Sequence, residues 1–197
     1  MSSTSTIERE QLLTHGLRII HARGFNNTSV QDIARAAGVP DRSFSAYFAS
    51  KEDFGLQILE IYYANSCATI SATLRNDALP PLQRLRDYLA LNRAHLDRDG
   101  MRNGCLYGNF SAEGSDHSEE LRQRIIDIFR QVQQAFSDCL KAAVRCGELR
   151  TRLECDEVAN FAVAALQGAI LMSKAQRSME PVRRFETMLF AMLQATP

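Results

Sequence analysis

The apolar residues of this chain recur every three or four positions along almost its whole length. That spacing places them on one face of an α-helix, and the strict alternation of a half-buried β-strand is absent. Glycines, prolines and turn dipeptides interrupt the pattern, and we therefore expect an all-α fold of about nine helices. By residue number, the expected helices cover 7–23, 28–38, 39–48, 50–74, 81–98, 105–113, 118–146, 155–174 and 181–194.

The second expected helix has clear start and stop signals. Thr28 and Gln31 stand three positions apart in front of an apolar run, which predicts a capping box with Thr28 as the N-cap. Gly38 is expected to end this helix in a left-handed conformation. Ser50, followed by acidic residues, is expected to cap the fourth helix.

Between these two helices lies the short segment VPDRSFSAYF, residues 39–48. A helix, a turn of three or four residues and a second short helix form a helix-turn-helix motif, whose second helix can enter the major groove of DNA. Val39, Phe44 and Phe48 are expected to hold the short helix to the core. The remaining side chains are then left outside, and they are mostly hydrogen-bond donors: Asp41, Arg42, Ser43, Ser45 and Tyr47.

Composition and charge limit the other possibilities. The chain has 197 residues, 45% of them apolar, which is enough for a hydrophobic core. No stretch reaches the ~18 uninterrupted apolar residues of a membrane span, and the N-terminus lacks a signal-peptide pattern, so we expect a cytoplasmic protein without a membrane partner. The formal net charge is +0, so DNA binding must rest on the placement of a few groups.

The five cysteines are an odd number without a C-x-x-C pair, and the four histidines show no ligand spacing. This pattern fits neither a disulfide framework nor a zinc site, and we expect mostly free thiols, no metal and no cofactor. A nucleophilic cysteine enzyme, with Cys105 paired to a histidine, lacks a supporting Cys/His signature. A helical adaptor that binds protein is the other alternative to a DNA-binding function.

The run FNNTSVQDIARAAGVPDRSFSAYFASKEDF closely resembles the N-terminal signature of TetR-family transcriptional repressors. The resemblance implies a homodimer that binds a double-stranded DNA operator and is released by a small-molecule inducer. It implies a DNA-binding domain over residues 1–50, and a sensing domain over 51–197 that pairs through its last two helices. By position, it implies DNA contacts from Thr28, Gln31, Arg42, Ser43, Ser45, Tyr47 and Lys51. Pro40, Asp41 and Ser45 depart from the usual residues of the signature.

The segment RNGCLYGNFSAE contains the candidate sensing residue. Cys105 lies between two glycines at the expected start of a helix, three residues after Arg102, and both features favour a thiolate. A small buried residue at a tight packing point is the alternative interpretation. The segment also resembles the sensing domain of NemR- and AcuR-like members of the TetR family, of which the NemR-like ones respond to electrophiles through a cysteine.

Other residues of the second half are weaker candidates. Lys174 is a candidate charge partner of Cys105, and Phe110 and Phe129 are candidates for lining a ligand pocket, although aromatics at helical spacing are more often core. In the last two helices, two sets of residues suit a dimer interface or an intramolecular core. They are the small residues Ala162, Ala165, Gly168 and Ala169, and the stripe Phe185, Met188, Leu189 and Met192.

Overall fold

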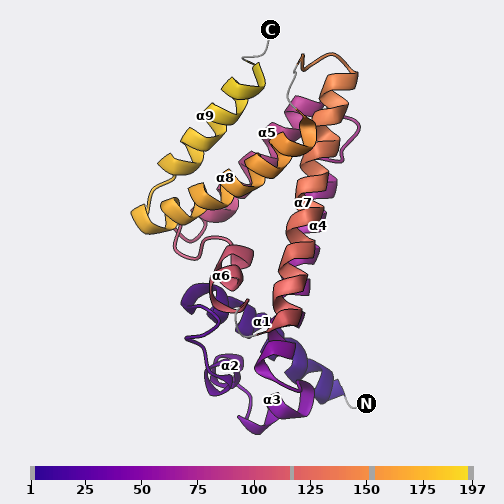
Figure 1. Cartoon of the computed structure of the whole chain (residues 1–197). Helices are drawn as coiled ribbons and strands as arrows, with labels where there is room; N and C mark the ends of the chain where they lie inside the picture. Colours follow the sequence, from indigo (N-terminus) through magenta and orange to yellow (C-terminus); the bar gives the residue numbers. More distant parts are fainter. Residues whose placement is uncertain (1–2, 116–117, 151–153, 195–197) are drawn as a thin grey trace. The chain divides into compact units, whose positions relative to one another are not determined.

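The structure is a computed structural model that describes residues 3–115, 118–150 and 154–194 (Figure 1). In the described residues all regular structure is helical, and each expected helix is found, with ends shifted by a few residues. The helices are α1 Ser3–Arg23, α2 Val30–Ala37, α3 Arg42–Tyr47, α4 Lys51–Ala72, α5 Pro81–Asp97, α6 Leu106–Glu113, α7 Glu119–Arg145, α8 Cys155–Gln176 and α9 Glu180–Gln194.

The chain forms two compact units, which are described separately. Unit 1 comprises Met1–Ala64 and Leu106–Ile125, and unit 2 comprises Asn65–Cys105 and Ile126–Pro197. Unit 1 therefore contains α1, α2, α3 and α6 together with the first parts of α4 and α7. The functional division at residue 50 that the family resemblance implies stays a prediction.

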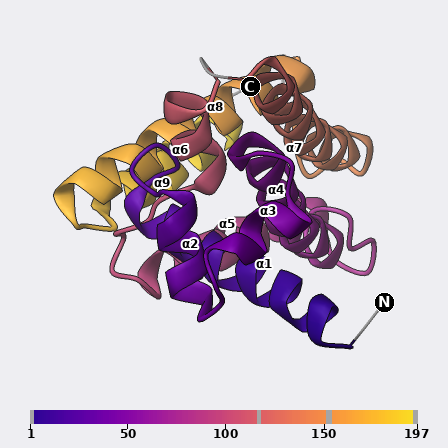
Figure 2. The same ribbon diagram turned by 90° about the horizontal axis from the view of Figure 1, so that it is seen from below.

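In unit 1, α1, α2 and α3 pack together as a three-helix head (Figure 2). Phe44 and Phe48 of the short helix join Phe54 of α4 in an aromatic cluster with ring centroids 4.7–5.2 Å apart. Gly16 permits the close approach of α1 to this cluster, because a Cβ atom there would overlap the Phe54 ring. Burial of these rings stabilises the head by roughly 1.5–3 kcal/mol for each side chain.

The cap of α2 differs from the sequence prediction by one residue. Ser29 is the N-cap, and the capping box joins Ser29 to Asp32, whereas Thr28 and Gln31 were predicted to form it. The Asp32 N–H donates to the Ser29 hydroxyl over 3.1 Å, and the Ser29 N–H donates to the Asp32 carboxylate over 3.1 Å. The Thr28 hydroxyl instead donates to the Gly24 carbonyl over 2.7 Å. The Thr28 hydroxyl is therefore engaged by a carbonyl four residues upstream, and the adjacent Ser29 serves as the cap.

Unit 2 has its core between α5, α7, α8 and α9. Tyr88 of α5 packs edge to face on Phe136 of α7 with ring centroids 5.1 Å apart. Burial raises the pKa of Tyr88 to about 12, so this phenol stays neutral. The Arg86 side chain of α5 covers the ring of Phe190 on α9, and its guanidinium carbon lies 4.1 Å from the ring centroid. The core thus ties α9 to α5.

Among the described helices, α8 is long and apolar enough to cross a membrane by length and composition alone. Its mean hydropathy reaches 1.3 over 18 residues, and 44% of that window is buried inside the structure. Core helices of globular proteins pass the same test, so this is a weak indication of a membrane span.

Candidate nucleic-acid interface and sensing segment

The geometry of a helix-turn-helix motif joins α2 to α3. Gly38 ends α2 in the left-handed region with φ +69°, as predicted, and the Val39 N–H donates to the Ala34 carbonyl over 3.1 Å. The chain then turns and begins α3, where Phe44 and Phe48 are each only 3% exposed. The two phenylalanines anchor α3 by one face and leave its other face outside unit 1.

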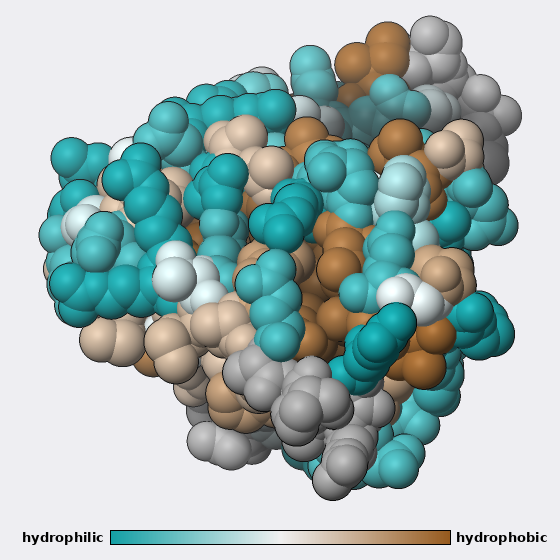
Figure 3. All heavy atoms as spheres, turned by 90° about the horizontal axis from the view of Figure 1, so that it is seen from above, coloured by the Kyte–Doolittle hydropathy of each residue, from teal (hydrophilic) through white to brown (hydrophobic). Residues whose placement is uncertain are grey.

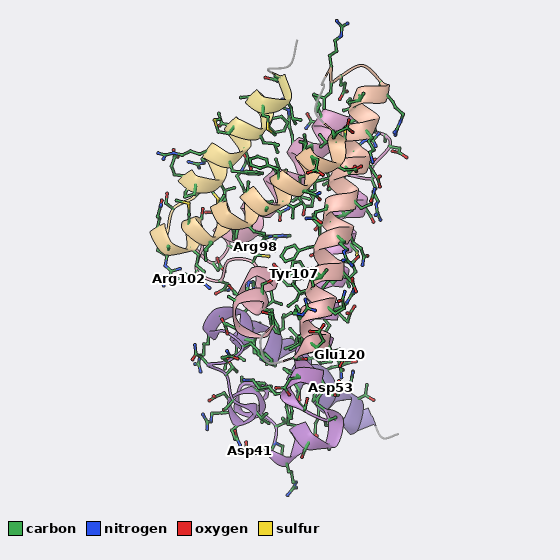
Figure 4. The ribbon with its side chains drawn as sticks, viewed as in Figure 1. Asp41, Asp53, Arg98, Arg102, Tyr107 and Glu120 are labelled. Carbon is green, nitrogen blue, oxygen red and sulfur yellow. The ribbon has the colours of Figure 1, made fainter. Side chains whose placement is uncertain are left out.

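The exposed face of α3 begins with an acid and a base. Asp41, Arg42 and Ser45 are exposed, and the Asp41 carboxylate does not cap the helix. Figure 4 shows Asp41 at the outer edge of unit 1. Within the described residues, no ion pair joins Asp41 to Arg42, so the guanidinium is available to a base edge or a phosphate.

Two predicted DNA contacts are not on the outer surface. The Ser43 side chain was expected outside, but Ser43 is only 8% exposed because it follows the buried face that Phe44 defines. Thr28 is fully buried, and the bond from its hydroxyl to Gly24 holds it inside unit 1. The prediction that the Ser43 side chain is left outside is therefore wrong, while DNA contacts from Ser43 and Thr28 stay predictions.

The other three predicted contacts lie at the edges of the motif. Gln31 is exposed on α2. Tyr47 is half-buried, and its phenol donates to the Glu8 carboxylate of α1 over 3.1 Å. Lys51 begins α4, as predicted, and Asp53 in the same turn accepts from the Ala49 N–H while its own N–H donates to the predicted cap, Ser50.

Lys51 is more constrained than a typical surface lysine. Its ammonium lies over the Phe25 ring, 4.5 Å from the centroid. Partial burial lowers the pKa of Lys51, while the carboxylates of Glu52 and Glu113 act to raise it. The ammonium is therefore partly shielded from water on the ring side, where the ring stabilises it, and a contact with an anion from the solvent side is compatible with this position.

Sequence reasoning missed one cation of this surface. Arg35 lies four residues after Gln31 on α2, and its side chain is 78% exposed, paired to Asp32 at 3.3 Å. The i, i+4 spacing from Gln31 is the signal that would have identified it.

The candidate sensing segment immediately precedes α6. Gly104 is buried at φ +71°, and a Cβ atom there would lie 3.2 Å from Cδ of Lys174. Lys174 of α8 is therefore packed beside the residue that precedes Cys105. Cys105 is half-buried against the core of unit 2 and lies near enough to Tyr88 to act electrostatically on it. Lys174 thus lies beside this segment, while its pairing with the Cys105 thiolate and the reactivity of the thiol stay predictions.

The other predicted sensing residues have different environments. Arg102 is exposed, and its N–H donates to Asp99 over 3.1 Å while its carbonyl accepts from Arg177 over 3.4 Å. Figure 4 labels this residue in unit 2. Phe110 is fully buried in the core of unit 1, 4.9 Å from the Phe25 ring, so it offers no surface to a ligand. Phe129 is partly buried on the core of unit 2, where a ligand contact stays a prediction.

In the part of the chain that the structure describes, all five cysteines are free thiols, and no group of three acidic, histidine or cysteine side chains could hold a metal ion. Cys139 is buried, and burial raises its pKa to about 11. This thiol is therefore protonated and unreactive at neutral pH.

Large apolar side chains are exposed on the last two helices. Phe161, Leu171 and Met172 of α8 are 57%, 68% and 54% exposed, and Met188 of α9 is 67% exposed. The spacing of the three α8 residues places them on one face of that helix, where exposed Gly168 also lies. Apolar atoms reach the surface of the molecule between polar side chains in Figure 3. We call Phe161, Leu171, Met172 and Met188 the apolar face.

Four of the eight residues predicted for a dimer interface or an intramolecular core are buried in the core of unit 2. Ala162 and Leu189 are 0% and 2% exposed, and Ala169 and Phe185 are 7% and 9% exposed. These residues face the inside of unit 2 because α8 and α9 pack on each other through them. Gly168 and Met188 are the members of the predicted set that are exposed.

The fold and the interface define a helix-turn-helix protein with a helical second half. Two family models match the chain: the bacterial regulatory proteins of the tetR family over residues 12–58, and the tetracyclin repressor-like C-terminal domain over residues 81–189. The second match covers more than half of the chain, and the protein belongs to the TetR family.

The chain is similar to one curated relative and two solved structures of this family in particular. The chain is 39% identical over 189 residues to the HTH-type transcriptional repressor DhaR of Mycobacterium sp. (strain GP1), covering 95% of this chain and 93% of DhaR. The crystal structure of regulatory protein TetR from Rhodobacter sphaeroides matches with a TM-score of 0.88 at 29% identity, covering 93% and 97% of the two chains. The reduced form of NemR from E. coli matches with a TM-score of 0.84 at 30% identity, covering 92% and 94%.

Proposed function

We propose that this protein is a sequence-specific DNA-binding transcriptional repressor that a small molecule releases from its operator. The observation that carries the proposal is the exposed face of α3, where Arg42 and Ser45 are presented by a short helix anchored through two phenylalanines. Membership of the TetR family and the likeness to the repressor DhaR support the same function. The enzyme and adaptor alternatives have no comparable support.

Arg42 is the residue proposed to read bases. Its guanidinium stands in the first turn of α3, and the N-terminal residues of a recognition helix are those that contact base edges in the major groove. Ser45 and Gln31 are further candidates for base or phosphate contacts. Lys51 and Tyr47 are candidates for phosphate contacts, although Tyr47 must first leave Glu8. Phosphate contacts position the protein on the duplex, whereas contacts with base edges read the sequence.

The repressor is proposed to act as a homodimer. Two copies of the apolar face can bury each other's exposed side chains on α8 and α9. The matched surfaces of a two-fold dimer place two recognition helices on one face of the duplex, and a roughly palindromic operator follows. A regulator of this kind acts in the cytoplasm, with a small-molecule inducer as its other partner.

The inducer is proposed to be an electrophile that modifies Cys105. Half-buried Cys105 next to buried Gly104 leaves little room for added bulk, so modification would displace the segment that leads into α6. The likeness to NemR supports this class of inducer. An ordinary reversible ligand, with Cys105 purely structural, is the second candidate and is supported by the packing of Cys105 on the core of unit 2.

A gel shift with the DNA upstream of the protein's own gene tests the proposed function. At about 0.15 M salt, specific binders prefer their operator over random DNA by about 10³-fold or more. A repressor gives a discrete shifted band that survives excess random competitor DNA. Equal binding to the upstream DNA and to a scrambled sequence would contradict the proposal.

A further inference from the structure

Glu113, the last residue of α6, is bound to the connection between α1 and α2 within unit 1. Its carboxylate accepts from the Asn26 N–H over 3.0 Å, and its carbonyl accepts from the Asn26 side-chain amide over 3.0 Å. These two bonds join residues 87 positions apart. The two bonds, both of ordinary length, tie the connection between α1 and α2 to the end of α6.

The carboxylate of Glu113 also packs on Gly24. Gly24 ends α1 at φ +94°, and a Cβ atom there would lie 2.6 Å from both carboxylate oxygens. The positive φ favours glycine at this position, and the absence of a side chain leaves room for the Glu113 carboxylate. Glu113 therefore contacts the chain on both sides of Phe25, by packing on Gly24 and by hydrogen bonds to Asn26.

Phe25 is the residue on which Lys51 rests. Its ring is 2% exposed and packs on Phe110 of α6 at 4.9 Å and on Gly55 of α4, where a Cβ atom would lie 3.0 Å away. The Lys51 ammonium lies 4.5 Å from the centroid of the same ring. The ring is therefore placed by this packing together with the backbone that Glu113 contacts, and the ammonium lies against the ring.

We propose that Glu113 is a positioning residue for DNA binding, which places the Lys51 ammonium for its phosphate contact by fixing the backbone around Phe25. The inference rests on the proposed function, because it needs Lys51 to contact DNA. Glu113 itself touches neither base nor phosphate in this account. Its effect on DNA binding passes entirely through Lys51.

A double-mutant cycle measures that dependence. Wild type, Lys51→Ala, Glu113→Ala and the double variant are titrated by fluorescence anisotropy with the operator DNA that wild type binds, between about 50 and 200 mM salt. The salt slope is the steepness with which the logarithm of the binding constant falls with the logarithm of the salt concentration. Loss of one phosphate contact per protomer reduces it by about 0.9, or about 1.8 for a dimer, so between these two salt concentrations the affinity of Lys51→Ala falls about 12-fold less than that of wild type. Glu113→Ala lowers the slope in the same direction, and the double variant equals Lys51→Ala alone.

Two control variants distinguish the proposed positioning role of Glu113 from the effect of removing a negative charge, and melting curves exclude loss of folding. Glu120→Ala removes another exposed carboxylate of unit 1, labelled in Figure 4, and is expected to keep the wild-type slope or steepen it slightly. Glu113→Gln keeps an oxygen acceptor for the Asn26 N–H, and is expected to stay close to wild type. Circular dichroism melting establishes that each variant is folded, and Glu113→Asp, whose carboxylate is one methylene shorter and withdraws from the Asn26 N–H, replaces Glu113→Ala if the latter is not.

Additive losses in the double variant overturn the inference, since Glu113 would then act independently of Lys51. An unchanged salt slope or tighter operator binding for Glu113→Ala overturns it as well, and so does a Glu113→Gln variant that loses as much as Glu113→Ala. Failure of wild type to prefer any upstream DNA is a different result, because it removes the proposed function before the cycle begins.

Discussion

The dimer interface gives a prediction whose magnitude follows from the structure. We consider Leu171→Glu, which replaces the most exposed side chain of the apolar face, 68% exposed in the single chain. Full burial of a leucine is worth about 1.5–3 kcal/mol, so the share that is still exposed contributes about 1–2 kcal/mol when the partner covers it. A two-fold dimer contains the change twice, which costs about 2–4 kcal/mol before any cost of burying the carboxylates.

This cost corresponds to a rise of the dimer dissociation constant by about 30-fold to 1,000-fold. Sedimentation velocity over a dilution series measures it, with Leu91→Glu as the matched control, because Leu91 of α5 is also exposed, at 40%, but lies outside the apolar face. The control is expected to dimerise like wild type. A monomeric wild type, or a Leu171→Glu variant with the wild-type dissociation constant, would refute the reasoning.

Two further predictions concern the cap of α2 and the sensing thiol. Ser29→Ala removes the capping box and lowers the free energy of unfolding by about 1 kcal/mol, measured in urea. The Ser29 hydroxyl and N–H hold the pKa of Asp32 below its usual 3.8. The part of the cap that joins the hydroxyl to the Asp32 carboxylate is therefore present above about pH 4 and is lost as the pH falls through the lowered pKa, so a deficit that does not shrink in acid would contradict this. After N-ethylmaleimide or hypochlorite, wild type releases its operator in a gel shift and Cys105→Ser retains it. Equal release by the serine variant would leave Cys105 a packing residue and favour a reversible ligand.

Local patterns in the sequence were sufficient for the helices and their ends. The left-handed conformation of Gly38 was predictable because it depends only on the local turn that ends α2. The inward orientation of Phe44 and Phe48 followed from their spacing of four residues. Thr28 and Ser29 are both good caps, and Ser29 is the one used because the Thr28 side chain is buried and bonded to the Gly24 carbonyl, which a sequence pattern does not reveal. Helix ends that depend on nearby residues are therefore predictable, and a choice between neighbours is not.

Contacts between distant segments could not be predicted. Asn26 and Glu113 are separated by 87 positions, and neither residue type indicates a partner. In α8, apolar residues occur on all sides, so periodicity does not distinguish the buried Ala162 and Ala169 from the exposed Phe161 and Leu171. Ser43 lies at the boundary between the two faces of α3, where a six-residue helix gives too short a pattern to assign it.

The central claim is that the exposed face of α3 reads a base sequence. The most direct measurement is the affinity of wild type and Arg42→Ala, by fluorescence anisotropy at about 150 mM salt, for a set of operators in which each base pair is changed in turn. We expect Arg42→Ala to lose about 1–3 kcal/mol on the operator and to lose discrimination at one base pair of each half-site, while the other positions keep theirs. An Arg42→Ala variant with the full wild-type profile, or one weakened equally on every sequence, would contradict the claim.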